Sequence, residues 1–173
     1  MKDRVDSLLS IILLVAIIAA IGTTIYVIAA PKERESFTDF FILGSKGMAA
    51  DYPERLVVGT GYPMFIGIGN HEYRNVTYTV ETWLVQVNNS DVSNISTISR
   101  MDRLDRFKFT LPHNETKTLS FNLAAPATGY NQVEFLLFNE LIPSENITGM
   151  DRINASYRDL HLWVTVREKP KLL

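Results

Sequence analysis

The apolar and polar positions of the chain follow two different patterns. Residues 8–30 form an uninterrupted run of 23 residues without a charge. As a helix this run spans roughly 34 Å at about 1.5 Å per residue, enough to cross a hydrocarbon core of about 30 Å. No face of the run is polar, unlike a helix on the surface of a soluble protein. The pattern therefore predicts one transmembrane helix at 8–30, preceded by a tail at 1–7 and followed by a charged neck at 31–36.

From residue 37 to residue 168, short segments alternate apolar and polar residues with a period of two. Such alternation is typical of antiparallel strands that cover one side of a core. Seven segments separated by turn residues predict an all-β domain, an immunoglobulin-like antiparallel β-sandwich at 37–168, followed by a tail at 169–173. The predicted strands include Phe37–Leu43, Met64–Ile68, Val76–Val80, Phe107–Leu111, Leu119–Leu123, Val133–Leu137 and Leu160–Val166.

Three segments depart from this alternation. Beyond Thr82 the apolar positions change from even to odd numbers, which predicts a β-bulge near residues 81–83 or a strand that changes sheets. Residues 99–106 carry apolar side chains three positions apart behind a capping serine, which predicts one or two helical turns. Residues 143–157 form a long polar connection, and we expect either a functional loop or a solvent-facing cover there.

Composition excludes several classes of function. The 173 residues carry a net charge of −2, so the chain has no basic field for nucleic acid. It has no cysteine, which excludes disulfides, thiolate zinc sites and cysteine nucleophiles. The three histidines are far apart in sequence and show no metal-ligand spacing, although distant histidines can converge in a fold. We therefore predict no cofactor and no metal site.

The asparagines indicate on which side of a membrane the predicted domain lies. All eleven follow the apolar run, and six begin a glycosylation sequon, where chance predicts about two. Since sequons are modified only outside the cell, we expect a cytoplasmic N-terminus and an extracellular C-terminal domain. Two alternatives stay open: a strand-rich protein can form sequons by accident, and residues 27–29 could be a signal-peptide cleavage site. The candidate glycosylation sites are Asn75, Asn88, Asn94, Asn114, Asn146 and Asn154.

The stretch Gly67–Val80 contains glycines, an Asn-His-Glu triplet and two tyrosines. It lacks the third glycine and the following helix of a dinucleotide fingerprint, and it has no nucleophile at a recognised spacing. We interpret it as two strands joined by a hairpin turn at 69–74, with Asn75, Thr77, Thr79 and Glu81 on a solvent-facing side. Because no other catalytic grouping is evident, we predict that the protein is not an enzyme.

The last predicted strand offers one candidate binding surface. Its polar face carries His161, Trp163 and Arg167. An outward tryptophan can stack on a sugar ring or on a partner protein. The alternative is structural, with Trp163 covered by a loop, by the helical turns or by the second sheet.

Four motifs resemble an archaeal membrane-protein family, domain of unknown function 1616, over about residues 36–168. They are Phe37–Gly44, Ala50–Pro53, Gly67–Tyr73 and Tyr157–Val166. The strand pattern is also similar to the immunoglobulin-like CARDB modules. The resemblance implies an archaeal cell-envelope protein with an immunoglobulin-like exterior domain, and it assigns no activity and no functional residue. Longer members of that family carry several membrane spans, whereas this chain shows one.

Together these observations predict a single-pass, N-glycosylated protein of the cell membrane whose exterior β-sandwich is an interaction or envelope-scaffolding module. Its expected partners are the lipid bilayer and an unidentified envelope or membrane protein. Two other functions stay open. The chain could be an accessory subunit of a membrane-bound enzyme, secretion or glycosylation complex, or a carbohydrate-binding module that uses Trp163.

Overall fold

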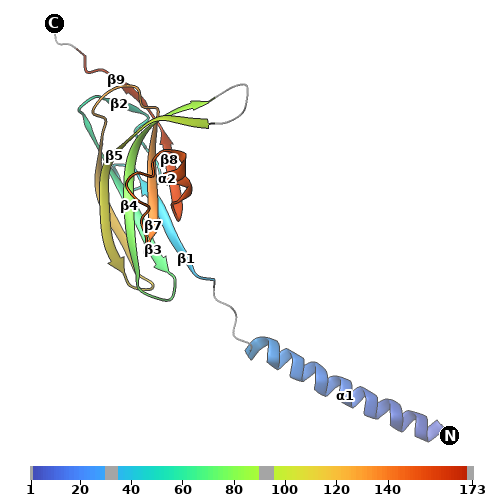
Figure 1. Cartoon of the computed structure of the whole chain (residues 1–173). Coiled ribbons are helices and arrows are strands. Elements are labelled where there is room, and N and C mark those ends of the chain that lie inside the picture. The colour runs from blue at the N-terminus through green and yellow to red at the C-terminus, as the bar shows by residue number, and fades with distance from the viewer. Residues whose placement is uncertain (1, 30–34, 90–95, 171–173) are drawn as a thin grey trace. The chain divides into compact units, whose positions relative to one another are not determined.

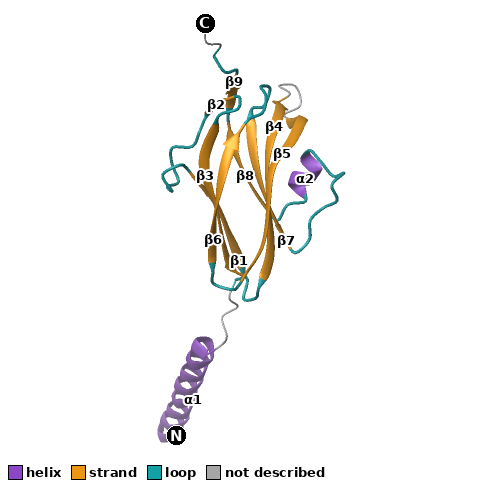
Figure 2. Cartoon of the chain, turned by 90° about the vertical axis from the view of Figure 1, so that its left-hand side faces the viewer, coloured by secondary structure: helices purple, strands orange, loops and turns teal. Residues whose placement is uncertain are grey.

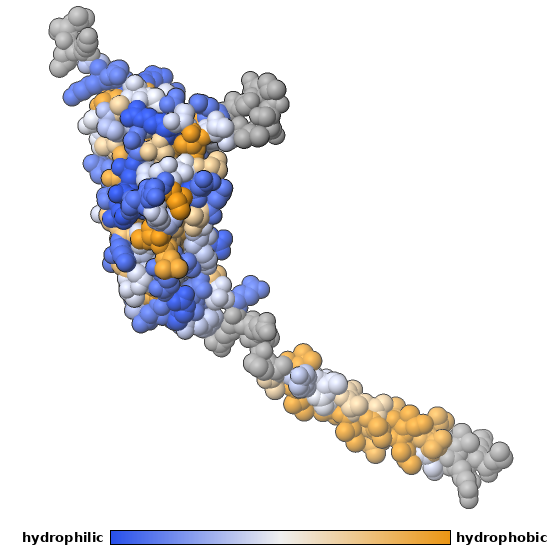
Figure 3. All heavy atoms as spheres, in the orientation of Figure 1, coloured by the Kyte–Doolittle hydropathy of each residue, from blue (hydrophilic) through white to orange (hydrophobic). Residues whose placement is uncertain are grey.

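The computed structural model describes residues 2–29, 35–89 and 96–170, and the chain divides into two compact units, 1–35 and 36–173 (Figure 1). The first unit contains helix α1, Lys2–Ala29. Within it, Ser7–Ala29 is long and apolar enough to cross a membrane, and all of its side chains are exposed. Figure 3 shows a mostly apolar surface along this helix. Its length and composition suit a membrane anchor or a signal sequence.

The hydroxyl groups near the end of α1 are satisfied within the helix. Thr23 Oγ1 donates a hydrogen bond to the Ala19 carbonyl at 3.0 Å, and Thr24 Oγ1 donates to the Ala20 carbonyl at 2.8 Å. Because both hydroxyls have partners on the helix itself, they do not need water. These threonines therefore leave the helix apolar in character.

The second unit is an antiparallel β-sandwich, which confirms the predicted immunoglobulin-like fold class (Figure 2). One sheet has the strand order β1-β3-β6 and the other β5-β4-β7-β8, while β2 and β9 form a short parallel pair. The strands are β1 Phe37–Leu43, β2 Arg55–Val57, β3 Gly61–His71, β4 Val76–Asn89, β5 Ser96–Leu111, β6 Thr116–Ala124, β7 Gln132–Asn139, β8 Arg158–Trp163 and β9 Thr165–Arg167.

The main core lies between the two sheets. Ile66 and Ile68 of β3 and Val80 of β4 are fully buried in it. Across the core, the rings of Phe121 and Phe135 meet edge to face, with centroids 6.1 Å apart. Each buried side chain of this size stabilises the fold by about 1.5–3 kcal/mol. The alternating residues of the predicted strands thus supply this core.

The four-stranded sheet is also buried on the part of its outer face that β4 and β7 form. Helix α2, Met150–Asn154, and the connections beside it lie over that face (Figure 2). Beneath them is a second apolar cluster, to which Ile142 and Ile153 contribute from the cover. Strands β4 and β7 are therefore covered on both sides, which explains the consecutive apolar residues at 83–85 of β4 and 135–138 of β7. The buried members of the second cluster are Trp83, Val85, Leu136 and Phe138.

The predicted irregularity near residues 81–83 is present, but its cause differs from the prediction. The pairing of β4 with β5 shifts between Thr82 and Trp83, and the extra residue is Leu104 of β5. Strand β4 keeps its register with β7 throughout, so Leu84 still faces the main core. Its odd-numbered apolar residues lie on the outer face, where α2 covers them. The change of phase thus reflects a second buried face.

The helical turns predicted at 99–106 were wrong, because the whole segment belongs to β5. In a strand, a three-residue spacing places side chains on opposite faces. Met101 accordingly packs in the second apolar cluster, and Leu104 packs against the main core. Asp102 accepts hydrogen bonds from the Tyr130 hydroxyl at 2.5 Å and from Arg100 at 2.7 Å. Pairing with β4 outweighs the local helical signal.

The predicted hairpin at 69–74 was also wrong, because β3 and β4 belong to different sheets and their connection crosses the sandwich. Asn70, fully buried, holds this crossing in place. Its Nδ2 donates to the Arg74 carbonyl at 2.8 Å and to the Leu111 carbonyl at 2.7 Å. Asn70 thereby joins the β3–β4 crossing to the end of β5.

Candidate functional site

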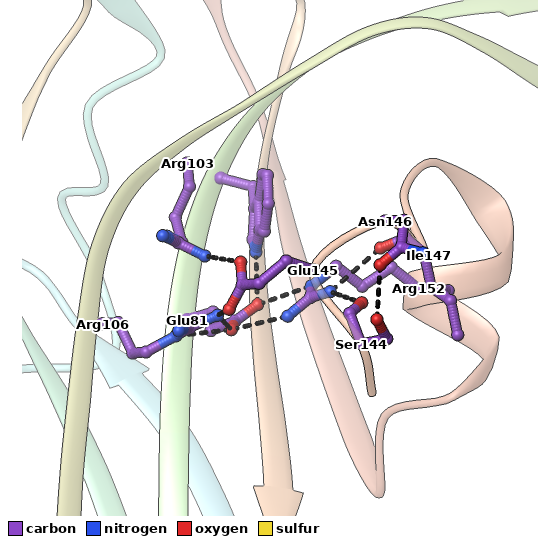
Figure 4. A network of polar contacts seen from close by, with 9 residues as sticks. Glu81, Arg103, Arg106, Ser144, Glu145, Asn146, Ile147 and Arg152 are labelled. Atoms are coloured by element: carbon purple, nitrogen blue, oxygen red, sulfur yellow. Dashed lines mark hydrogen bonds and ion pairs between the residues drawn. The ribbon is translucent and has the colours of Figure 1, made fainter. Parts of the chain in front are cut away.

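The outer face of the four-stranded sheet holds a buried network of charges centred on Glu81 of β4 (Figure 4). Arg152 of α2 donates two hydrogen bonds to the Glu81 carboxylate, from Nε to Oε2 and from Nη2 to Oε1, each at 2.8 Å. Neither side chain is exposed to solvent. Arg106 Nε of β5 adds a bond to Oε1 at 2.8 Å, and Trp83 Nε1 adds one to Oε2 at 2.9 Å. Each carboxylate oxygen of Glu81 thus accepts two hydrogen bonds.

Arg152 also fixes the cover in place. Its Nη1 donates to the carbonyls of Ser144 and Ile147 at 3.1 and 2.9 Å, and its guanidinium lies 5.3 Å from the centre of the Trp83 ring. Burial opposes ionisation of Glu81, but the hydrogen bonds from Arg152, Arg106 and Trp83 outweigh it and hold the pKa of the carboxyl below its usual value. We interpret the network as a clamp between β4 and α2.

The face of residues 75–81 that was predicted to lie in solvent is in fact partly buried. Asn75 is exposed, as predicted, but Thr79 and Glu81 are buried. At Glu81 the physical reason is α2, which supplies the countercharge of Arg152 and so permits a carboxylate beneath the cover.

A second carboxylate on the same face, Glu134 of β7, has a different environment. The side chain is 4% exposed, and Gln132 Nε2 donates to its Oε1 at 2.7 Å. Its other oxygen, Oε2, is buried without a hydrogen-bond partner among the described residues. Burial, and then the negative charge of Asp159, raise the pKa of Glu134 to about 8.

Glu134 lies beside two exposed side chains of β8, Asp159 and His161. In the sheet register Glu134 is directly opposite His161, and Asp159 is two residues away on the same face. One ligand atom from each of the three lies within 4.8 Å of the other two. This is the only group of three or more metal-ligating side chains within the described residues, and imidazole and carboxylate are groups that bind divalent metals.

The structure brings together two of the three predicted surface residues. The rings of His161 and Trp163 meet edge to face, with centroids 5.9 Å apart, and Trp163 is 53% exposed. Both line a cleft of about 220 Å³ between β8 and α2 that also includes Ile98 and Met150. Arg167 is exposed on β9, in the separate pair with β2. The predicted surface is thus reduced to the aromatic pair His161 and Trp163, and His161 also belongs to the group with Glu134 and Asp159.

The three histidines have separate surroundings. His71 Nε2 lies 3.1 Å from Asp39 Oδ2 on the three-stranded sheet. His113 Nδ1 accepts a hydrogen bond from the Tyr73 amide at 3.1 Å. Only His161 is part of the group with two carboxylates. Convergence of all three on one metal is therefore not observed among the described residues.

The candidate glycosylation sites lie on the surface wherever they are described. Asn94 lies outside the described residues. The exposed sequon residues are Asn75, Asn88, Asn114, Asn146 and Asn154.

Sequence reasoning missed Glu81, Glu134 and Arg152. A signal was present for Glu134, because it interrupts the strand at residues 133–138, which is otherwise apolar on both faces, whereas Glu81 lies among threonines and gave no such signal. A carboxylate at such a position must find a partner or stay neutral. Arg152 offered no comparable signal, since it lies in a polar connection.

Comparison with known proteins identifies a family. Residues 31–165 match DUF1616, a domain of unknown function. No curated protein matches the chain.

Several solved structures are similar in fold. The CARDB domain of the PF1109 protein from Pyrococcus furiosus, in complex with di-metal ions, is 14% identical, with 76% of this chain and 93% of that chain covered and a TM-score of 0.42. A β-glucosidase from Listeria innocua in complex with isofagomine is 13% identical, with 79% and 17% covered and a TM-score of 0.46. The sporulation control protein Spo0M from Bacillus subtilis is 10% identical, with 77% and 49% covered and a TM-score of 0.39. The chain spans about a sixth of the glucosidase, and at these values the likeness carries no argument about ligands or activity.

Proposed function

The chain belongs to the DUF1616 family, and we propose that it is a single-pass, N-glycosylated membrane protein whose β-sandwich is displayed outside the cell as a non-enzymatic interaction or envelope-scaffolding module. The observation that carries the proposal is α1. Its stretch Ser7–Ala29 is apolar on every side and belongs to a compact unit separate from the sandwich. Surface of this kind is stable in lipid and unfavourable in water.

The orientation rests on the sequons. Five of the six asparagines are exposed on the sandwich, where an oligosaccharide can attach without disturbing the core. None of the six lies before the apolar helix. An extracellular sandwich and a cytoplasmic N-terminus account for both observations.

The absence of cysteine provides a clean test of this topology. Ser120 of β6 is exposed, and Asp3 lies before the apolar stretch. In intact cells, a membrane-impermeant maleimide should label a Ser120→Cys variant and leave an Asp3→Cys variant unlabelled. Both should react after permeabilisation, and the cysteine-free parent should not react at all. Labelling of Asp3→Cys alone in intact cells, or release of the sandwich into the medium, would contradict the proposal.

The accessory-subunit alternative makes a different prediction about α1. If the helix only anchors the sandwich, replacing residues 8–30 with an unrelated apolar span should leave the proteins that copurify unchanged. Loss of those proteins while the chain stays in the membrane would favour the subunit function.

The exposed Trp163 supports one second candidate, a carbohydrate-binding module. A half-exposed indole next to the His161 ring can stack on a sugar. On a glycan array, this function predicts binding that Trp163→Ala abolishes and that Arg167→Ala, on the separate strand pair, leaves intact. Absence of binding, or binding indifferent to Trp163→Ala, would exclude it.

A further inference from the structure

We propose that Glu134, Asp159 and His161 form a binding site for one divalent transition-metal ion, of which zinc is the natural probe. The three side chains come from two paired strands, β7 and β8, and project from the same face of the sheet. One ligand atom of each already lies within 4.8 Å of the others. Glu134 and Asp159 are 25 positions apart in the chain, so the three residues form no local sequence motif.

The buried oxygen of Glu134 is the observation that points to a ligand. A polar atom inside a protein that lacks a hydrogen-bond partner costs about 1–3 kcal/mol, so such atoms are rare and call for an explanation. Glu134 is 4% exposed, and its Oε2 is unpartnered among the described residues. A cation next to Asp159 and His161 would give that oxygen a partner.

No lysine or arginine among the described residues fills this role. In the described part of the chain, no lysine or arginine forms an ion pair with Glu134 or Asp159. The neighbouring Arg158 places its guanidinium 5.6 Å from the centre of the Tyr157 ring. Two carboxylates thus lie close together with no lysine or arginine partner among the described residues, which is unfavourable unless a proton or a metal ion joins them.

The geometry can adapt to a metal ion. Ligand atoms around a tetrahedral zinc ion lie roughly 3.4 Å apart for bonds of about 2.1 Å. The present group is within 4.8 Å, so small rotations suffice. Asp159 and His161 are exposed and can make them, while the hydrogen bond from Gln132, two residues along β7, holds Glu134.

The ligand set indicates the class of ion. One imidazole and two carboxylates suit zinc or manganese, whereas calcium and magnesium prefer oxygen ligands throughout. Three protein ligands leave a fourth position for water on the side of the cleft that His161 and Trp163 line.

The test is zinc binding by the full chain in detergent, with any affinity tag removed and bound metal first stripped by a chelator. Isothermal titration should give one zinc ion per chain, and an excess of magnesium should not displace it. Since even residues that only support a ligand contribute about 10–100-fold to metal affinity, losing a ligand should weaken binding at least tenfold. His161→Ala and Glu134→Gln should both show this loss.

His71→Ala is the matched control, because His71 is the other histidine beside a carboxylate. It should leave the affinity unchanged. Asp159→Asn replaces an exposed ligand and serves as a third variant if Glu134→Gln does not fold. The proposal is overturned if zinc does not bind, if His161→Ala binds as tightly as the parent, or if His71→Ala alone removes binding.

Discussion

Glu81 and Glu134 are two buried carboxylates on adjacent strands of one sheet, and both face outward beneath the same cover. Glu81 has two arginines and an indole around it, and each of its oxygens accepts two hydrogen bonds. Glu134 has one neutral partner, Gln132, and a second carboxylate nearby. One position is completed by the chain itself, while the other is incomplete without a proton or a cation. The comparison teaches that burial alone does not identify a site, whereas an unsatisfied buried group does.

The largest loss of unfolding free energy should come from neutralising Glu81, the carboxylate whose partners the chain itself supplies. In a Glu81→Gln variant, Arg152 stays buried without its countercharge, which costs about 3–5 kcal/mol. Urea unfolding followed by tryptophan fluorescence measures this loss of unfolding free energy. Glu145→Gln, which removes an exposed partner of Arg103 and Arg106, should cost far less, because solvent screens an exposed ion pair. Equal losses in the two variants would mean that Glu81 is no clamp.

Acid should remove part of the same stabilisation. The pKa of Glu81 is lowered in the folded protein, so the folded state binds fewer protons than the unfolded chain. Its contribution is fully present above the unfolded value of about 4.3 and is lost as the pH falls through the lower folded value. Below about pH 4.5, the unfolding free energy of the parent should therefore fall by up to about 1.4 kcal/mol per pH unit more than that of Glu81→Gln. Parallel pH profiles for the two proteins would contradict this assignment.

The smallest effect should come from the matched change at the incomplete position. Glu134→Gln keeps the shape of the side chain and an acceptor for Gln132, and it breaks no ion pair in the described part of the chain. We expect the unfolding free energy of metal-free protein to change by less than about 1 kcal/mol, because no charged partner is left behind. A loss as large as that of Glu81→Gln would show that Glu134 has a countercharge after all.

Much of the sandwich could be predicted from the sequence, because alternation such as that of Leu119, Phe121 and Leu123 reports directly which side of a strand faces the core. The failures arose where tertiary contacts override local pattern. Residues 99–106 resemble helical turns, yet β4 supplies a partner strand along their whole length. The crossing after β3 resembles a hairpin, since the pattern of one strand does not reveal its sheet.

The candidate site was less predictable than the fold. His161 and Trp163 could be placed on one exposed face, since they belong to a single strand with clear alternation. The approach of Glu134 to His161 depends on how β7 pairs with β8, and no local feature of the sequence fixes that register. The burial of Arg152 depends on a five-residue helix, which is too short for its two apolar residues to reveal a helical pattern in the sequence.

The most direct test of the contrast between the two carboxylates is anomalous diffraction at the zinc edge, from crystals of the full chain grown with zinc. We predict an anomalous-difference peak between Glu134, Asp159 and His161. We predict none at Glu81, because both of its carboxylate oxygens already accept hydrogen bonds from Arg152. The absence of a peak at the first position, or a peak only beside His71 and Asp39, would contradict the account.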